Sequence, residues 1–140
     1  MKKLTFLFLF VLALPTLGSS QDNYVLELIV KEFDEIKGNV RICLADSKEG
    51  FMKKCFEFKE VPVTSSEMKI YFQDVPPGEY AISLFHDEDS SGKINTDGFL
   101  GLPSEDYGFS NNPRILLSIP KYRDCSFKVD SDKTVTVKLK

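Results

Sequence analysis

Short runs in which apolar and polar residues alternate recur along the chain and predict β-strands. Leu26, Leu28 and Val30 alternate with Glu27, Ile29 and Lys31, a period of two that is typical of a half-buried strand. The same period returns in the segments 40–44, 68–72, 125–129 and 135–139. Because a shift of one residue would turn each apolar set toward solvent, the period also predicts which side chains enter the core.

The segment 80–85 is the most hydrophobic strand candidate, and we place it at the centre of a sheet. Tyr80, Ile82 and Leu84 share one face, while the opposite face is also largely apolar. The segment follows a turn with two prolines and a glycine, residues that favour chain reversal. The predicted core consists of Leu26, Leu28, Val30, Val40, Ile42, Leu44, Tyr80, Ile82, Leu84, Phe127, Val135 and Val137.

Turn residues between these segments predict how the strands follow one another. Lys37, Gly38 and Asn39 form a tight-turn sequence, which predicts a hairpin between the first two strands. Pro62 argues against a central strand at 61–63, and a short apolar run follows at 115–119. About seven short strands without a long helix predict an all-β fold, a single-domain β-sandwich. We expect the final strand to lie in a sheet because its apolar period is clean.

The first twenty residues have the layout of a secretory signal peptide. Lys2 and Lys3 precede an apolar run at 4–14, and small residues end the segment. This run is too short to cross a bilayer, since a spanning helix needs about 20 apolar residues. We therefore predict cleavage after Ser20, an exported domain at residues 21–140, and no membrane anchor in that domain.

Composition narrows the classes of partner. Removal of residues 1–20 takes two of the 18 basic residues and none of the 21 acidic ones, so the remaining charge is 16 − 21 = −5. An acidic chain without a stripe of Lys and Arg argues against a nucleic-acid partner. An exported domain is instead expected to meet a protein or a glycan of the cell envelope.

Three cysteines, Cys43, Cys55 and Cys125, are expected to meet an oxidising compartment. One intramolecular bridge can form, and Cys43 with Cys55 is the favoured pair because these two lie in neighbouring segments. The alternative is three small buried side chains without a bridge. A zinc site of the Cys/His type is disfavoured, since the chain has one histidine and no Cys-x-x-Cys spacing.

A long polar segment follows the central strand and contains the pattern Asp87-x-Asp89-x-Ser91-Gly92-Lys93-x-Asn95. It matches the first nine positions of an EF-hand calcium loop, in which side-chain oxygens stand at positions one, three, five and nine and a glycine stands at six. The twelfth position, where a bidentate Glu is expected, holds Gly98, and Asp97 lies one residue earlier. The alternative is a turn held by Asp and Asn side chains without a metal.

The calcium hypothesis assigns six ligands within this segment and leaves the rest of the coordination shell to Glu105, Asp106 or water. The six are Asp87, Asp89, Ser91, the carbonyl of Lys93, Asn95 and Asp97.

His86 directly precedes the loop and supports an alternative class of function, a hydrolase acting on envelope material with His86 and loop carboxylates. A general base needs a substrate or nucleophile within hydrogen-bond reach. Ser104 and Ser110 lack the Gly-x-Ser-x-Gly context of a nucleophile elbow. A binding or structural module is therefore favoured over an enzyme, with His86 bonding the backbone of the loop.

Three motifs together resemble a known family. They are Pro76-Pro77-Gly78-x-Tyr80-Ala81, the segment from His86 to Asp97 that contains the EF-hand-like pattern, and Leu100-Gly101-Leu102-Pro103-x-Glu105-x-Tyr107-Gly108-Phe109-Ser110-Asn111-Asn112. They are similar to the exported bacterial domains called DUF2141. The resemblance implies a small β-sandwich of transthyretin-like or immunoglobulin-like type with no established activity. Members commonly show Asp-x-Asn-x-Asn-Gly-x-Leu-Asp-Thr-Asn in the loop. In this chain, Asp89 and Ser91 stand where the first two Asn of that pattern fall. Asn95 stands in place of its second Asp, and Asp97 in place of its last Asn.

Overall fold

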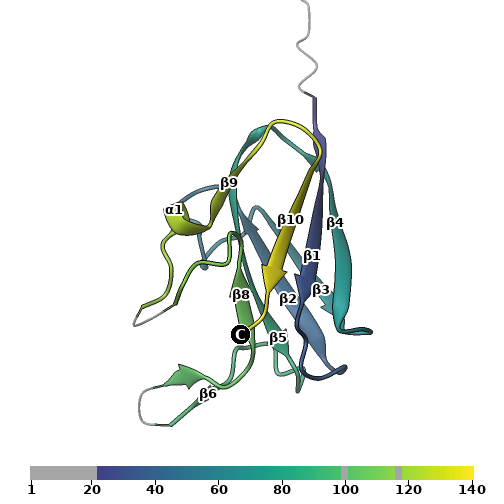
Figure 1. The fold of residues 1–140 in the computed structure, drawn as a ribbon. Coiled ribbons are helices and arrows are strands. Elements are labelled where there is room, and N and C mark those ends of the chain that lie inside the picture. Colours follow the sequence, from purple (N-terminus) through teal and green to yellow (C-terminus); the bar gives the residue numbers. More distant parts are fainter. Residues whose placement is uncertain (1–21, 99–100, 116–117) are drawn as a thin grey trace, which may run out of the picture.

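The computed structural model describes residues 22–98, 101–115 and 118–140, which form two facing β-sheets (Figure 1). The smaller sheet has the order β10-β1-β4 and consists of β1 (Tyr24–Lys31), β4 (Glu67–Val75) and β10 (Lys133–Lys138). The larger sheet has the order β3-β2-β5-β8, with β9 also paired to β5, and consists of β2 (Asn39–Ala45), β3 (Glu57–Pro62), β5 (Gly78–Asp87), β8 (Tyr107–Phe109) and β9 (Ser126–Val129). The predicted all-β sandwich is confirmed, whereas the predicted signal peptide at 1–20 lies outside the described residues.

Three short elements complete the described part of the chain. β6 (Thr96–Asp97) and β7 (Leu102–Pro103) form a two-stranded ribbon. α1 (Tyr122–Cys125) is a single helical turn. The described residues thus contain ten strands rather than about seven. The difference arises because β6, β7 and β8 are two or three residues long, too short to leave an alternating pattern in the sequence.

Side chains from the inner faces of both sheets form one hydrophobic core. Eleven of the twelve predicted core residues are buried, and those of β1 and β2 are fully so. Phe127 packs against this core but is only partly buried. It lies on β9, which pairs with β5 over four positions at the margin of the sheet. The period-two pattern therefore predicted the core correctly wherever a strand is covered on both sides.

The predicted hairpin between the first two strands is wrong. β1 pairs with β4 and β10, whereas β2 pairs with β3 and β5, so the two strands belong to different sheets. The connection between them carries Phe33, whose side chain is buried in the core cluster. Burial of this aromatic ring between the sheets makes the connection a crossover, a role that the turn sequence at Lys37–Asn39 does not reveal.

β5 is the central strand of the larger sheet, as predicted. It pairs with β2 along one side and with β8 and β9 along the other. The strand extends beyond the apolar segment 80–85, so His86 and Asp87 are strand residues rather than the first residues of a loop. This extension carries the polar side chains of the site into a fixed backbone frame.

The three cysteines occupy two different environments. Cys43 and Cys55 form a disulfide between β2 and the segment before β3, which confirms the favoured pairing. Cys125 is a free thiol, and burial raises its pKa to about 12. A thiol held in its protonated form is a poor nucleophile and a poor metal ligand, so Cys125 has a packing role.

The C-terminal third of the chain follows the predicted pattern in part. Residues 116–117 of the apolar run at 115–119 lie outside the described residues, and Ile115 and Ser118 are not in a strand. The predicted final strand is confirmed, because β10 pairs in parallel with β1 and Leu139 is buried beyond its end.

Pro62 is the last residue of β3, an edge strand that pairs with β2 in the described part of the chain. This agrees with the sequence, which argued against a central strand at 61–63. No helix in the described ranges is long and apolar enough to cross a membrane.

Replacement of Ile82 by alanine is expected to lower the free energy of unfolding by about 2 to 5 kcal/mol, because the side chain is fully buried and its loss leaves a cavity. Urea denaturation measures the change. Ile36→Ala is the matched control, since it removes the same atoms from a side chain that is 50% exposed, and a change below about 1 kcal/mol is expected there. Equal losses in the two variants would contradict the assigned core.

Joint replacement of Cys43 and Cys55 by alanine is expected to cost about 2 to 4 kcal/mol of unfolding free energy, because the bridge restricts the unfolded chain. The same urea measurement applies. Addition of a thiol reductant should lower the stability of the parent protein toward that of the variant and leave the variant unchanged. A parent protein that is insensitive to reductant while its bridge is verifiably reduced would refute this stabilising role.

Candidate metal centre

The candidate site lies where the pairing of β5 with β8 ends. Phe85 is opposite Tyr107, and the N–H of His86 donates a hydrogen bond of 2.8 Å to the carbonyl of Asp106, which extends the ladder by one residue. Continued alternation places His86 and Asp106 on the inner face and Asp87 and Glu105 on the outer face. Two polar pairs therefore occupy opposite faces of one ladder end.

On its other side, β5 is approached closely by the start of β2. Gly38 has a φ of +60°, and a Cβ atom added there would lie 2.1 Å from the carbonyl oxygen of Asp87. A larger residue at position 38 would push the two backbones apart. The glycine therefore lets β2 and the end of β5 come together beside the site.

Asp87 organises the first half of the loop although its side chain is fully buried. Its Oδ1 accepts the N–H of Ser91 at 2.8 Å, and its Oδ2 accepts the N–H of Gly92 at 2.9 Å. Gly92 has a φ of +80°, a backbone conformation that glycine adopts without steric cost. The loop therefore bends back over the carboxylate, as both the calcium loop and the hydrogen-bonded turn without a metal require.

Asp89 connects the two ends of the same turn. Its Oδ1 accepts the N–H of Ser91 at 3.0 Å, and its Oδ2 accepts the side-chain amide of Asn95 at 2.8 Å. Hydrogen bonds from the side chains of Asn95 and Ser91 lower the pKa of Asp89. The carboxylate is thus held ionised next to Asp87.

Glu105 enters the site from the far end of the long loop and is only 6% exposed. Its carboxylate accepts the N–H of Glu88 at 3.1 Å and the N–H of Asn95 at 2.8 Å. One carboxylate oxygen each from Asp87, Asp89 and Glu105 lie within 4.8 Å of one another. Of the groups that the sequence left open for completing the shell, Glu105 lies at the site, whereas Asp106 lies on the opposite face.

The remaining predicted ligands lie around this trio. The hydroxyl of Ser91 donates to the carbonyl of Lys93 at 2.9 Å and lies 3.5 Å from the side-chain oxygen of Asn95. Asp97 belongs to β6, is exposed, and lines the same surface hollow as Asp89, Asn95 and Glu105. Asn95 and Asp97 thus line the hollow of the trio, Ser91 bonds Asp87 and Asp89, and the carbonyl of Lys93 is connected to them through Ser91.

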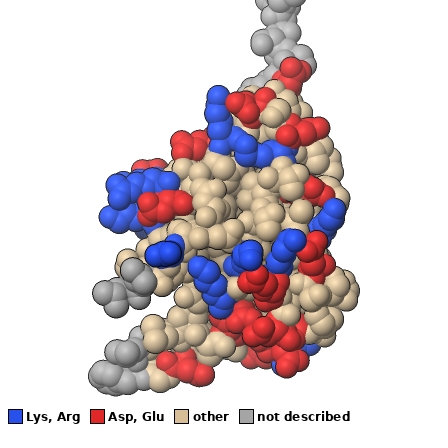
Figure 2. Space-filling view, in the orientation of Figure 1, with Lys and Arg blue, Asp and Glu red and all other residues tan. Residues whose placement is uncertain are grey.

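Two basic side chains lie near the three carboxylates, and each is paired with another acid: Lys37 lines the same hollow and binds Glu88 at 3.0 Å. Nη1 of Arg41 lies 3.8 Å from Oδ2 of Asp87 and is shared with Glu60, which it binds more closely. Figure 2 shows acidic side chains gathered at the lower end of the molecule, where β5 ends. Backbone N–H groups orient the carboxylates but carry no net charge, so the site keeps an excess of negative charge.

The inner face of the ladder end has a different character. His86 is fully buried, and its Nε2 lies 2.7 Å from the carbonyl oxygen of Lys37. Burial raises the pKa of Asp106, and the nearby carboxylates of Asp34 and Glu88 raise it further. Ser110 is bonded elsewhere, since its hydroxyl donates to the backbone carbonyl of Cys125 and accepts a hydrogen bond from the N–H of Ile82. The hydrogen bond of the His86 ring is thus to the β1–β2 connection, and not to the backbone of the loop after β5 as the sequence predicted.

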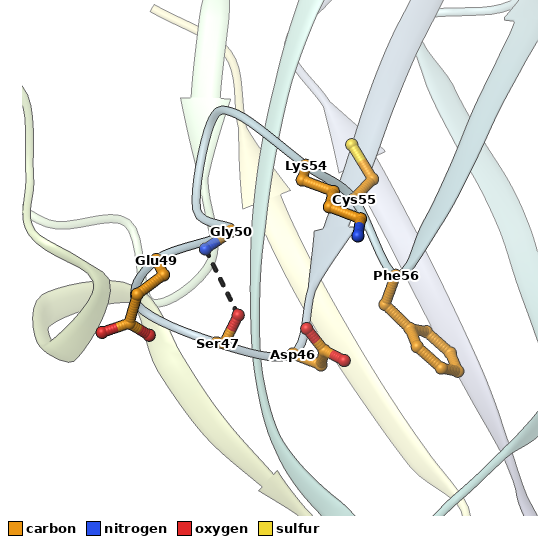
Figure 3. A pocket seen from close by; sticks show the side chains of 7 residues that line it. All are labelled: Asp46, Ser47, Glu49, Gly50, Lys54, Cys55 and Phe56. Carbon is orange, nitrogen blue, oxygen red and sulfur yellow. Dashed lines mark hydrogen bonds between the residues drawn. The ribbon is translucent and has the colours of Figure 1, made fainter.

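A second hollow lies far from these carboxylates, at the connection between β2 and β3 (Figure 3). Asp46, Glu49, Lys54 and Phe56 line it beside the disulfide. Figure 3 shows the side chains of Glu49 and Phe56 on opposite sides of the hollow and pointing away from each other. Its polar groups do not converge on a common point, so the carboxylate trio is the stronger candidate.

Comparison with known proteins identifies one related family. A family model described as "Uncharacterized protein conserved in bacteria (DUF2141)" matches residues 29–138, from β1 to the end of β10. No curated protein matches the chain. No solved structure matches it either.

Proposed function

The chain belongs to the DUF2141 family, and we propose that it is an exported binding or structural module whose loop, residues 87–97 together with Glu105, holds a calcium ion. The observation that carries the proposal is the convergence of carboxylate oxygens from Asp87, Asp89 and Glu105 within 4.8 Å. Two of these three side chains are buried, where uncompensated charge is costly. A bound cation compensates that charge.

The chemistry of the donors favours calcium over other cations. The groups that surround the trio are carboxylate, amide, hydroxyl and carbonyl oxygens, which are the ligands of hard cations. Ca²⁺ takes six to eight such oxygens in flexible geometry, whereas Mg²⁺ requires a tighter octahedron and gives up its waters reluctantly. A loop of this length suits the larger ion. Glu105 takes the part that the twelfth-position Glu has in an EF-hand loop.

Occupation of the site would join three parts of the molecule. Asp87 ends β5, Asp89 and Asn95 belong to the loop, and Glu105 precedes β8. An ion shared among them would fix the loop on the end of the larger sheet. The surface presented there to a protein or a glycan of the envelope would then depend on calcium.

Export is supported by the disulfide between Cys43 and Cys55. Such bridges persist in oxidising compartments and are rare where thiols are kept reduced. Extracellular calcium modules commonly bind weakly, with dissociation constants of about 10⁻⁴ to 10⁻³ M. The hydrolase alternative gains no support from His86, because its ring is fully buried and its Nε2 is engaged by a backbone carbonyl.

Calcium at 10 mM is expected to raise the melting temperature by roughly 4 to 10 °C, because binding to the folded state alone stabilises it by about 1 to 3 kcal/mol at the affinity given above. Differential scanning calorimetry measures the shift, and Mg²⁺ at the same concentration should give a much smaller one. Amide spectra are expected to show changes concentrated at residues 87–97 and 105.

Asp89→Ala is the informative variant, because Asp89 is exposed and alanine removes its ligand oxygens, whereas asparagine is a usual residue at the third position of a calcium loop. The calcium-dependent rise should fall to less than half of the parent value. Asp22→Ala is the matched control, since it removes one exposed carboxylate that lies before β1. A rise that is absent in the parent, or equal in parent and Asp89→Ala, would leave the loop as a turn held by hydrogen bonds alone.

A further inference from the structure

We propose that the inner face of the same ladder end binds a second divalent cation, of the zinc type, through His86, Glu88 and Asp106. One ring nitrogen of His86 and one carboxylate oxygen from each acidic residue lie within 4.8 Å of one another. The ring of His86 faces away from the side chain of Asp87, because the two are successive residues of β5. Glu88 follows the strand and also lines the hollow beside Asp89 and Glu105.

The ring of His86 supplies the observation that points to a ligand. Within the described residues, its Nδ1 is the only buried side-chain nitrogen or oxygen that lacks a hydrogen-bond partner. Nε2 lies 2.7 Å from the carbonyl oxygen of Lys37, and a carbonyl can only accept, so Nε2 carries the proton. In the tautomer with its proton on Nε2, the lone pair available to a ligand is at Nδ1. Histidines that bind metals commonly donate their other N–H to a backbone carbonyl in this manner.

The surroundings of the ring fix its orientation and concentrate negative charge beside it. Phe33 packs edge-on against His86 with ring centroids 5.2 Å apart. Asp106 is directly opposite His86 in the ladder, as their 2.8 Å backbone hydrogen bond shows. Glu88 follows two residues later, and its carboxylate forms an ion pair with the half-exposed side chain of Lys37 at 3.0 Å. A cation bound by the imidazole would thus have two carboxylates within reach, since one ring nitrogen and one oxygen of each acid lie within 4.8 Å of one another.

The size of the cluster is compatible with a tetrahedral ion after a small contraction. Bonds of about 2.0 to 2.2 Å place zinc ligands about 3.3 Å apart, so the present spacing requires a closure of up to about 1.5 Å. Glu88 and Asp106 are partly exposed, and side-chain rotation can provide that movement. A donor set of one imidazole and two carboxylates suits zinc better than calcium, and three protein ligands leave the fourth position for water.

The experiment uses the exported protein without an affinity tag, freed of metal by a chelator and titrated with Zn²⁺. Because His86 is the only histidine of the chain, its imidazole gives a single pair of ¹⁵N resonances. We expect binding of one zinc ion that shifts the Nδ1 resonance and retains the Nε2–H signal, since that proton is held by Lys37. Calorimetry gives the affinity.

Variants separate this site from the calcium loop. Glu88→Gln and Asp106→Asn, each checked for a folded state by urea denaturation, should weaken zinc binding at least tenfold. Asp89→Ala should leave the zinc affinity within a factor of two of the parent value, whatever its effect on calcium. The proposal is overturned if zinc leaves the Nδ1 resonance unmoved, if both acidic variants bind zinc as tightly as the parent, or if Asp89→Ala abolishes zinc binding.

Discussion

Antiparallel pairing of β5 with β8 is the constraint on which both polar clusters depend. The hydrogen bond from the N–H of His86 to the carbonyl of Asp106 continues the ladder beyond the apolar part of β5. Strand geometry then sends successive side chains to opposite faces. Two neighbouring residues, His86 and Asp87, consequently face different environments, one toward the space between the sheets and the other toward the loop. A one-residue slip of β8 would exchange the partners of both.

Burial of Asp87 explains why the loop has a defined shape. A fully buried carboxylate requires hydrogen-bond donors, and the side chain of Arg41 approaches only one of its oxygens, at 3.8 Å. The N–H groups of Ser91 and Gly92 supply the donors, which is possible only if the chain turns back at once. This reversal of the chain also brings Asn95 to Glu105, and their hydrogen bond closes the loop on β8. Loop order thus follows from a charge carried at the end of a strand.

The period of two in the sequence was sufficient to predict the core and the central position of β5, because burial on one face leaves a direct trace in residue type. It was not sufficient for strand pairing. The assignment of β1 and β2 to different sheets depends on Phe33, which the sequence gives as one apolar residue in a polar connection. The buried position of His86 did leave a signal, since it continues the inner-face series Tyr80, Ile82 and Leu84. The sequence could not tell whether Glu105 or Asp106 lies beside Asp87 and Asp89. That depends on the register of β8 against β5, which no local pattern specifies.

The same hydrogen bonds are expected in a turn without a metal and in a calcium loop. The two differ in whether a cation balances the negative charge of the carboxylates. An ionised carboxylate has about four lone-pair sites, so Asp87 keeps accepting capacity after binding two backbone N–H groups. Those donors satisfy polarity and fix the direction of the carboxylate, but they add no charge. Arg41 is the positive side chain that contacts the trio, and Glu60 shares it. The backbone therefore arranges the oxygens in advance, and the cation that we propose would contribute the charge that hydrogen bonds cannot supply.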